Sequence, residues 1–477
     1  NKLKNCGFSA LHKNGEYRLT IHYQYYNERQ EAWFDSNTRM EIEGFQNIQK
    51  YCRTNTIDFD EIPSYVKFTS KYKKKYNIDQ MEKLNAHKQY KTQIESGEYP
   101  DMFHGLNIDD YEMRVNYKTE KNIKYGKGRD GMRLKTDMNS WTDKFKTYRY
   151  IKRFTFIKAD TPYKIDCSIV KSSKVRKNNR GWFNMIPTKN IQDANVFNNI
   201  EEYEIELELQ DIGTYANETV LFKMMKKGIQ YVLSGLQNSN FPIKYSLEKD
   251  ILNEYLKLTN QKNNTEKRAP YKVNLKHKRY FIGYNSISLE LENIIPKYKN
   301  EIPNINTPYT VTEKADGARR LLYIYKDGNI YLIDNNMNVT FTGCNIGRSG
   351  KESLINTIID GELVTHTIKD EYKPVYLAFD VYFWNGDDYR NYPFMNISSL
   401  KYKDSKDNPV DRNKFRKDTL FAICKSLDIH NQSITDNTLP PMYIKTKEFE
   451  DNITNESIFT ASKKILDKID NGLFPYE

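Results

Sequence analysis

The chain has 477 residues, and 74 Lys and Arg residues against 63 Asp and Glu residues give it a net charge of +11. This length predicts two or three domains, and the positive charge favours a polyanionic partner without fixing the function. The five cysteines and seven histidines show no metal-binding spacing, which argues against a zinc site and indicates reduced thiols. No apolar run reaches the length of a membrane span, so we expect no membrane partner.

The first part of the chain is predicted to consist mainly of strands. Alternating polar and apolar residues predict strands over 17–26 and 38–43, followed by a short helix over 44–52. A basic run at 67–75 is interpreted as a solvated loop or strand edge. Arg or Lys recurs at alternate positions of four further predicted strands, of which the last two form a hairpin: 112–120, 131–137, 148–157 and 163–171.

The segment 201–210, EEYEIELELQ, has a regular two-residue period. Apolar residues occupy one face of the predicted strand, and the opposite face carries three carboxylates: Glu204, Glu206 and Glu208. Successive residues on one face lie ~6.5 Å apart, near enough for their side chains to converge on one Mg²⁺ or Mn²⁺. Two interpretations stay open for this strand, a divalent-metal site and a solvated charged face.

Two amphipathic segments, 219–236 and 247–258, predict packing helices. The polar, proline-containing segment 260–274 follows them and marks a domain boundary. We therefore assign residues 1–258 to a first domain, 259–277 to a linker and 278–477 to a second domain.

The stretch 309–323, YTVTEKADGARRLLY, is predicted to form a strand, a short turn and a second strand. Its turn has the spacing K-x-D-G-x-R, formed by Lys314, Asp316, Gly317 and Arg319. A lysine amine attacks phosphorus only when it is neutral. Because its ordinary pKa is ~10.4, nearby cations, a metal ion or burial must lower that pKa. An exposed charged hairpin is the alternative, but four fixed positions favour a nucleophilic lysine.

Two later predicted strands hold acidic residues among apolar neighbours. The strand IIDGELV at 358–364 contains Glu362, and the strand VYLAFDVYFW at 375–384 contains Asp380. A carboxylate in the middle of such an apolar strand needs a partner or a metal ion, which makes Asp380 a candidate metal ligand. Helices are predicted over 418–427 and 456–468.

These motifs, in this order, resemble those of the covalent nucleotidyltransferases, which include messenger-RNA guanylyltransferases and DNA and RNA ligases. The resemblance implies that Lys314 is the nucleophile that carries GMP and that Arg319 contacts the sugar and phosphate of the nucleotide. Asp316 and Gly317 complete this nucleotide-binding turn. Glu362, in Asp360-Gly361-Glu362-Leu363, would hold the ribose or the metal, and Phe379 would stack on the purine.

Other parts of the family pattern are not expected within this chain. Residues 471–474 are a degenerate version of the family's D/E-G-L-I-F strand, and we expect the true strand and the terminal K-x-K beyond residue 477. The second domain is therefore expected to be incomplete at its C-terminal end, without a lid domain or a methyltransferase region.

The chain as a whole resembles the two-headed capping enzymes of large DNA viruses, in which a metal-dependent, tunnel-type RNA triphosphatase precedes a guanylyltransferase. The resemblance implies that the carboxylates of 204–208 ligate the catalytic Mg²⁺ or Mn²⁺. It also implies that cations on other strands contact the RNA triphosphate: Arg39, Lys118, Lys135 and Lys171. We expect the first acidic strand of that pattern before residue 1, with Glu41 and Glu43 as a second candidate.

The resemblance implies an α+β fold, with an antiparallel β-tunnel domain like that of triphosphate tunnel metalloenzymes followed by a nucleotidyltransferase domain. The implied function is mRNA 5′ capping, in which the γ-phosphate of 5′-triphosphate RNA is hydrolysed and GMP is transferred from GTP through a lysyl-GMP intermediate. Further implied partners are a cap methyltransferase region or subunit and a viral RNA polymerase, in the host cytoplasm or the virion. Two alternatives remain: an ATP-dependent polynucleotide ligase, which has no use for the glutamate strand, and a non-catalytic RNA-binding subunit with remnant motifs.

Overall fold

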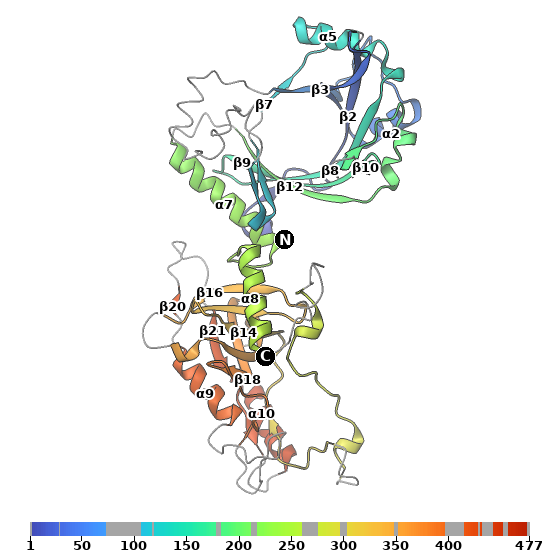
Figure 1. The fold of residues 1–477 in the computed structure, drawn as a ribbon. Coiled ribbons are helices and arrows are strands. Elements are labelled where there is room, and N and C mark those ends of the chain that lie inside the picture. The colour runs from blue at the N-terminus through green and yellow to red at the C-terminus, as the bar shows by residue number, and fades with distance from the viewer. Residues whose placement is uncertain are drawn as a thin grey trace, which may run out of the picture. The chain divides into compact units, whose positions relative to one another are not determined.

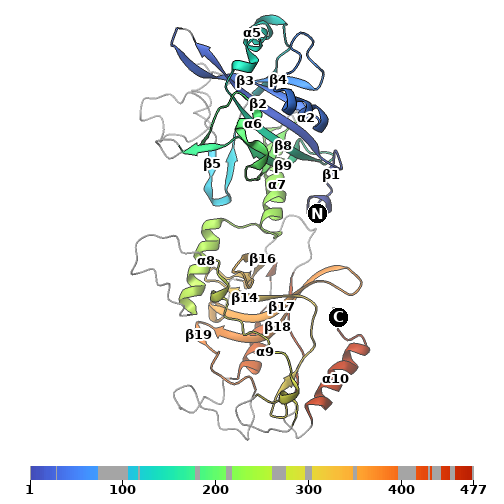
Figure 2. The ribbon, with the colours of Figure 1, turned by 90° about the vertical axis from the view of Figure 1, so that its right-hand side faces the viewer.

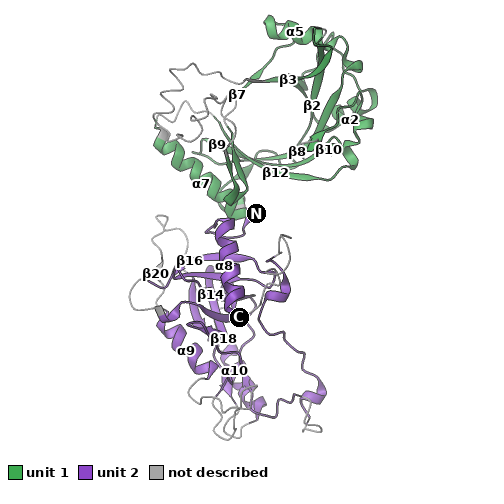
Figure 3. Ribbon diagram, in the orientation of Figure 1, with its two compact units in different colours: residues 1–235 green, residues 236–477 purple. Residues whose placement is uncertain are grey.

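The computed structural model divides into two compact units, residues 1–235 and 236–477 (Figure 3). In the described part of the chain, no helix is both long and apolar enough to cross a membrane. The structure describes residues 2–27, 29–72, 106–116, 119–177, 183–210, 217–259, 275–295, 303–347, 352–395, 415–427, 430–431, 442–451 and 457–474.

Unit 1 is built on one antiparallel sheet of eight strands, which curls around on itself in Figure 1. The strand order is β12-β9-β8-β2-β3-β4-β7, and β1 also pairs with β8. The strands are β1 (Ser9–Ala10), β2 (Glu16–Asn27), β3 (Ala32–Glu43), β4 (Val66–Tyr72), β7 (Thr119–Asn122), β8 (Lys146–Ile157), β9 (Tyr163–Ser172) and β12 (Glu202–Leu209).

The two faces of this sheet differ in polarity because side chains alternate along each strand. On the outer face, Leu19, Ile21 and Met40 are fully buried and pack beneath two helices, α2 (Phe45–Thr54) and α5 (Gly128–Met138). A third helix, α7 (Glu218–Leu236), covers the outer face of β9 through Met224 and Met225. The opposite, concave face is lined mainly by charged and polar side chains.

Short elements complete unit 1. The hairpins β5–β6 and β10–β11 each form a two-stranded antiparallel sheet. The bounds are α1 (Lys2–Asn5), β5 (Leu106–Ile108), η1 (Asp109–Tyr111), β6 (Met113–Val115), η2 (Trp141–Asp143), β10 (Val175–Lys177), β11 (Phe183–Met185), α6 (Ile191–Ala194) and η3 (Val196–Asn198), where η denotes a 3-10 helix.

Unit 2 is built on a second sheet of eight strands, in the order β19-β18-β17-β14-β15-β16-β20. All of these pairs are antiparallel, whereas β21 adds to β18 in parallel. The strands are β14 (Ala318–Ile324), β15 (Asn329–Ile333), β16 (Val339–Asn345), β17 (Thr357–His366), β18 (Tyr372–Trp384), β19 (Asp387–Asp388), β20 (His430–Asn431) and β21 (Tyr443–Thr446).

Helices cover both faces of this second sheet (Figure 2). The helix α8 (Tyr245–Leu258) packs on the face that carries Leu321 and Tyr323, and α9 (Arg416–Ser426) packs on the face that carries Leu322 and Ile324. The remaining elements are η5 (Lys278–Tyr280), η6 (Leu291–Asn293), β13 (Thr310–Val311), η7 (Glu352–Leu354), β22 (Glu450–Asp451), which pairs with β13, and α10 (Ile458–Asp470).

The division between the units differs from the expected boundary at residues 258–278. Ile251, Leu252 and Tyr255 of α8 are fully buried in the core of unit 2, against the sheet that contains the lysine turn. The helix 247–258 therefore belongs to the second unit rather than to the first, and the division falls before it.

The structure confirms a mixed α/β architecture with antiparallel sheets, and several predicted elements are present. The short helix at 44–52, the hairpin of β8 and β9, the strand at 201–210 and the helices at 219–236 and 247–258 all form. The predicted strand at 131–137 is wrong, because this segment lies in α5. Leu134 and Met138, four residues apart, bury one side of that helix.

Candidate functional sites

The lysine turn of unit 2 lies between β13 and β14. Glu313 and Ala315 are each 1% exposed, whereas Lys314 between them is exposed. This alternation anchors the turn on both sides and presents the Lys314 side chain to solvent. Asp316 is exposed as well. The turn therefore offers an amine on a fixed backbone.

Gly317 is required by close packing rather than by an unusual backbone angle. A Cβ atom at this position would lie 2.7 Å from Cγ of Glu362 and 2.8 Å from the carbonyl oxygen of Leu363. The missing side chain allows β14 to approach β17 at the point where the turn enters the sheet. Arg319 and Glu362 then stand directly opposite one another in the β14–β17 ladder.

Arg319 is held by a buried carboxylate at the centre of the sheet. Its Nε and Nη2 atoms donate to Oδ1 and Oδ2 of Asp360 at 3.1 and 2.5 Å, and Asp360 is fully buried. The hydroxyl of Tyr382 donates to the same carboxylate at 2.6 Å. The hydrogen bonds that Arg319 donates to Asp360 are the main cause of the raised pKa of Arg319.

Aromatic rings flank the Arg319 guanidinium. Its central carbon lies 5.6 Å from the ring centre of Phe281 and 5.9 Å from that of Phe379. Its Nη1 atom donates to the carbonyl oxygen of Tyr284 at 2.6 Å. Phe379 thus lies beside the arginine that follows the lysine turn, in keeping with a nucleotide-binding position.

Lys447 is a further cation at this site, and sequence reasoning did not identify it. Its Nζ atom donates to the carbonyl oxygen of Glu313 at 2.9 Å and lies 3.5 Å from a carboxylate oxygen of Glu362. It also lies 5.6 Å from the ring centre of Phe379, although Lys447 itself is only 4% exposed. The K-T-K pattern at 445–447 was the available signal, but we expected such a motif beyond the end of the chain.

Asp380 has a cation as its partner. Its Oδ2 atom accepts from Nη1 of Arg416 at 2.6 Å, and its Oδ1 atom accepts from the backbone N–H of Val381. Burial raises the pKa of Asp380 to about 6, and the charge of Arg416 partly offsets this effect. Arg416 thus supplies the partner that a carboxylate in an apolar strand needs, and the role of Asp380 as a metal ligand stays a prediction.

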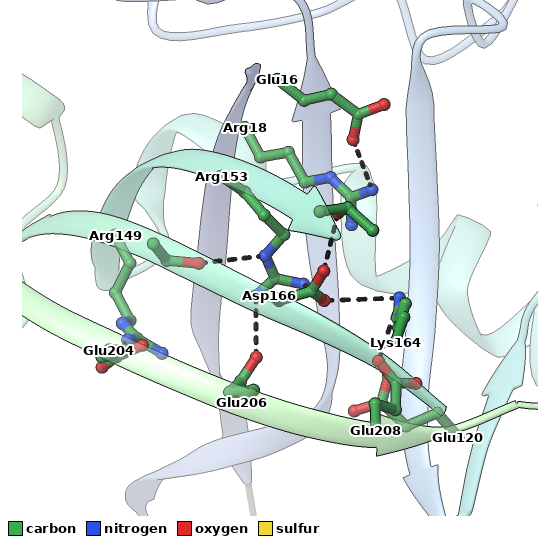
Figure 4. A network of polar contacts seen from close by, with 12 residues as sticks. Glu16, Arg18, Glu120, Arg149, Arg153, Lys164, Asp166, Glu204, Glu206 and Glu208 are labelled. Carbon is green, nitrogen blue, oxygen red and sulfur yellow. Dashed lines mark hydrogen bonds and ion pairs between the residues drawn. The ribbon is translucent and has the colours of Figure 1, made fainter. Parts of the chain in front are cut away.

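In unit 1, the concave face of the sheet carries a network of ion pairs around the glutamates of β12 (Figure 4). Glu204 pairs with Arg149 at 2.5 Å, Glu206 with Arg153 at 2.9 Å and Glu208 with Lys164 at 3.1 Å. The predicted face of three carboxylates therefore exists, and each carboxylate is matched by a cation from β8 or β9.

A buried carboxylate lies at the centre of this network. Asp166 is fully buried, and its oxygens lie 3.2 Å from Nη1 of Arg153 and 3.4 Å from Nζ of Lys164. The hydroxyl of Thr155 donates to it at 2.6 Å. Because Asp166 neutralises part of their charge, two cations can remain close together on the concave face.

The four cations predicted to contact a triphosphate do not all lie on the concave face. Arg39 lies on the concave face, where it pairs with Glu41 at 2.8 Å and with Glu120 at 3.0 Å. Lys135 lies on the exposed surface of α5, outside the sheet, because its segment is a helix. Lys118 lies outside the described residues.

Lys171 lies on the face opposite to the glutamates. Side chains alternate between the two faces of a strand. Val170 and Ser172, the neighbours of Lys171 on β9, face the same way as Asp166. Lys171, which is paired in register with Tyr150, therefore faces the other way. Its Nζ atom donates to the carbonyl oxygen of Phe197 at 3.0 Å. The expectation that Lys171 and Lys135 share one site with the glutamates is therefore wrong.

The donors on the concave face decide whether a divalent ion would fit there. The carboxylate oxygens of Glu204, Glu206 and Glu208 are of the type that Mg²⁺ and Mn²⁺ prefer. Among the residues the structure describes, no group of three or more His, Cys, Asp or Glu side chains is placed to hold a metal. The donor chemistry fits, and an ion would have to exchange places with the paired cations.

Comparison with known families adds to this geometry. Residues 247–474 match the family model described as mRNA capping enzyme, catalytic domain. This range begins within α8 and contains Lys314, Arg319, Asp360, Glu362 and Lys447. No curated protein sequence matches the chain. The C-terminal part of the chain is thus similar to the catalytic domain of mRNA capping enzymes, and this similarity implies guanylyltransferase activity with GTP and RNA as substrates.

Proposed function

We propose that the chain is an mRNA capping enzyme of the two-activity type found in large DNA viruses, and that Lys314 carries GMP covalently between GTP and RNA. The observation that carries this proposal is the clustering of Arg319, Glu362 and Lys447 beside an exposed Lys314. In addition, Phe379 lies beside both of the neighbouring cations. Such a group combines a nucleophile, positive charge for phosphates and an aromatic surface for a base.

In the proposed reaction, the neutral amine of Lys314 attacks the α-phosphorus of GTP. An N–P bond forms, the bond from phosphorus to the pyrophosphate oxygen breaks, and the lysine loses a proton to solvent. A terminal oxygen of the RNA 5′-diphosphate then attacks the same phosphorus, the N–P bond breaks and the amine regains a proton. Arg319 and Lys447 supply positive charge near the phosphates as negative charge shifts onto the departing oxygens.

A nucleotide-labelling experiment tests this proposal. The full chain is incubated with α-labelled GTP or ATP and Mg²⁺, and protein-bound label is measured after denaturing electrophoresis. We expect label from GTP that is lost in Lys314→Ala and kept in Lys369→Ala, which removes an exposed lysine from a turn after β17. Label from ATP alone would identify a ligase, and absence of label from both nucleotides would identify a binding protein with an inactive site.

For unit 1, we propose that the concave face binds the 5′-triphosphate of RNA and promotes hydrolysis of its γ-phosphate. The support is the placement of Arg149, Arg153 and Lys164 on one face, each within 3.1 Å of a glutamate of β12. Phosphate oxygens would replace these carboxylates as partners of the cations, and Arg39 would extend the same face.

A divalent ion belongs to this second proposal. Glu204, Glu206 and Glu208 would hold Mg²⁺ or Mn²⁺ once the cations have turned to the phosphates. The ion would neutralise charge on the transferring phosphoryl group. The RNA left by this reaction would end in a 5′-diphosphate, which is the acceptor that the lysyl-GMP step requires.

A further inference from the structure

The hairpin of β2 and β3 extends beyond the strands that flank it (Figure 2). Strand β8 pairs with β2 only as far as Tyr23, and β4 pairs with β3 only as far as Thr38. The two strands continue to pair with each other up to Asn27 and Ala32. The end of the hairpin is therefore supported by few neighbours.

This extension carries aromatic side chains where a solvent-exposed hairpin would ordinarily carry polar ones. Tyr26 and Trp33 stand opposite each other with ring centres 5.4 Å apart, and Trp33 lies 5.3 Å from Phe145. We call Tyr26, Trp33 and Phe145 the aromatic cluster. Tyr26 is 48% exposed and Trp33 is 39% exposed, so much of this apolar surface is in water.

Cross-strand aromatic pairs also stabilise hairpins without any ligand. A cation beside the rings points beyond that role. The ammonium of Lys189 lies 5.9 Å from the ring centre of Phe145. The aromatic cluster thus combines rings with a cation, as single-stranded nucleic acid sites do.

The aromatic cluster lies further along the face of β2 that also lines the concave face, so the same RNA could contact both. Alternation along β2 places Tyr26 on the same side as Arg18 and His22, and His22 is paired in register with Arg39. Tyr26 lies four residues beyond His22, which is about 13 Å along the strand. Cations for phosphates and rings for bases therefore follow one another along one face.

We propose that the aromatic cluster is a stacking surface for the bases of single-stranded RNA whose 5′ phosphates lie on the concave face of unit 1. This inference rests on the proposed function for its RNA ligand. It adds a base-binding site outside both reaction centres. Stacking tolerates any base, so the surface would hold transcripts without reading their sequence.

The test measures binding of the full chain to a 3′-fluorescent, single-stranded RNA with a 5′-hydroxyl end, by anisotropy. This RNA needs neither γ-phosphate hydrolysis nor Lys314, so failure of the enzymatic proposals does not affect the result. We expect Trp33→Ala to raise the Kd by about 5- to 150-fold, the range for loss of one base–ring stack. Trp33→Phe should restore most of the affinity, and Trp33→Leu should not.

Two controls show whether a change in Kd comes from loss of stacking rather than from altered charge or misfolding. Phe222→Ala removes a 70% exposed aromatic residue from α7 and should leave the Kd unchanged. An abasic oligonucleotide with the same phosphates should bind the wild type and Trp33→Ala equally. Equal affinity of wild type and Trp33→Ala for RNA would overturn the proposal. Full affinity of Trp33→Leu for RNA would also overturn it. A change in self-association alone would overturn it as well, because it would assign the surface to a second copy of the chain.

Discussion

Asp360 holds the guanidinium of Arg319 through two hydrogen bonds, 3.1 and 2.5 Å long, from a position that is closed to solvent. The two residues lie on adjacent strands and are 41 residues apart in the chain. Arg319 keeps Nη1 on the carbonyl oxygen of Tyr284, so the guanidinium plane is fixed on both sides. In the proposed reaction, a fixed guanidinium plane would help to hold the nucleotide in the one orientation in which it meets Lys314.

Asp360→Asn should therefore impair nucleotidyl transfer more than it impairs folding. The substitution keeps the shape of the side chain but removes the charge that orients Arg319. A shift of about 1 Å in a group near a reaction centre lowers the rate by as much as about 100-fold. We expect a loss of that order in the labelling rate per folded molecule. The measurement is single-turnover labelling from GTP, with the folded fraction followed by circular dichroism.

Tyr382→Phe is the matched control for this prediction. It removes one hydrogen bond to Asp360, which is 2.6 Å long, and leaves the ion pair with Arg319 in place. The labelling rate should fall less than in Asp360→Asn. Equal losses in the two variants would mean that general disruption of the sheet, rather than the orientation of Arg319, controls transfer.

Lys447→Met should reduce the labelling rate at least about tenfold. Methionine preserves most of the length and packing of the buried side chain but removes the charge between Glu313 and Glu362. Lys445→Met, two residues earlier and exposed, should label like the wild type. If Lys447→Met also labels normally when GTP is limiting, Lys447 supports the backbone of the turn and has no role towards the nucleotide.

Arg153→Ala should reduce release of γ-phosphate from 5′-triphosphate RNA by about 100-fold or more, because loss of one preorganised charged donor has effects of this size. Arg153 contacts Asp166, Ser168 and Glu206 at 3.2, 3.1 and 2.9 Å, so it lies at the centre of the network. The measurement is phosphate release at several Mg²⁺ and Mn²⁺ concentrations.

Lys152→Ala provides the comparison for this variant. Lys152 is the preceding residue on β8, and its ammonium lies over the ring of Tyr17 on the other face of the sheet. Phosphate release by Lys152→Ala should match that of the wild type. Normal release by Arg153→Ala would remove the concave face of unit 1 from the proposed reaction.

Asp380 predicts a stability change at mildly acidic pH. Its pKa is about 6 in the folded protein against an ordinary value of 3.8, so the folded state holds the proton more tightly than the unfolded state. The resulting stabilisation is fully present below pH 3.8 and is lost as the pH rises through 6. Over this window, the free energy of unfolding contributed by this group should fall by up to about 3 kcal/mol.

The measurement for this prediction compares urea unfolding of the wild type with that of Asp380→Asn between pH 4 and pH 6.5. The variant carries no titrating group at this position. As the pH rises, the free energy of unfolding of the wild type should therefore fall relative to that of Asp380→Asn. A difference that stays constant across the window would show that Asp380 keeps an ordinary pKa beside Arg416.

Local patterns predicted much of the fold. The two-residue period of 201–210 gave β12 with its glutamates on one face, and apolar spacing gave the helices α7 and α8. The prediction failed at 131–137, where alternating charges concealed the four-residue spacing of Leu134 and Met138. The domain boundary also differed, because the polarity of a loop does not reveal which core a neighbouring helix joins.

The candidate sites were predicted less completely than the fold. The family resemblance assigned Arg319 and Glu362 to one nucleotide site, and the two residues stand opposite each other on strands that pair directly. Partners that are distant in the chain were not predictable, and Arg416 beside Asp380 is the clearest case. Lys171 shows a further limit, because a shift of one residue along a strand moves a side chain to the opposite face.

The contact between Lys447 and Glu313 spans 134 residues of chain, and it depends on β21, which joins β18 in parallel. Contacts of such long range form late, because a large loop must close before they contribute stability. On the ribosome, the lysine turn emerges well before Lys447 does. A nascent chain would therefore display the Lys314 amine before Lys447 can join it, and competence for the proposed lysyl-GMP chemistry would arise only after Lys447 has been synthesised.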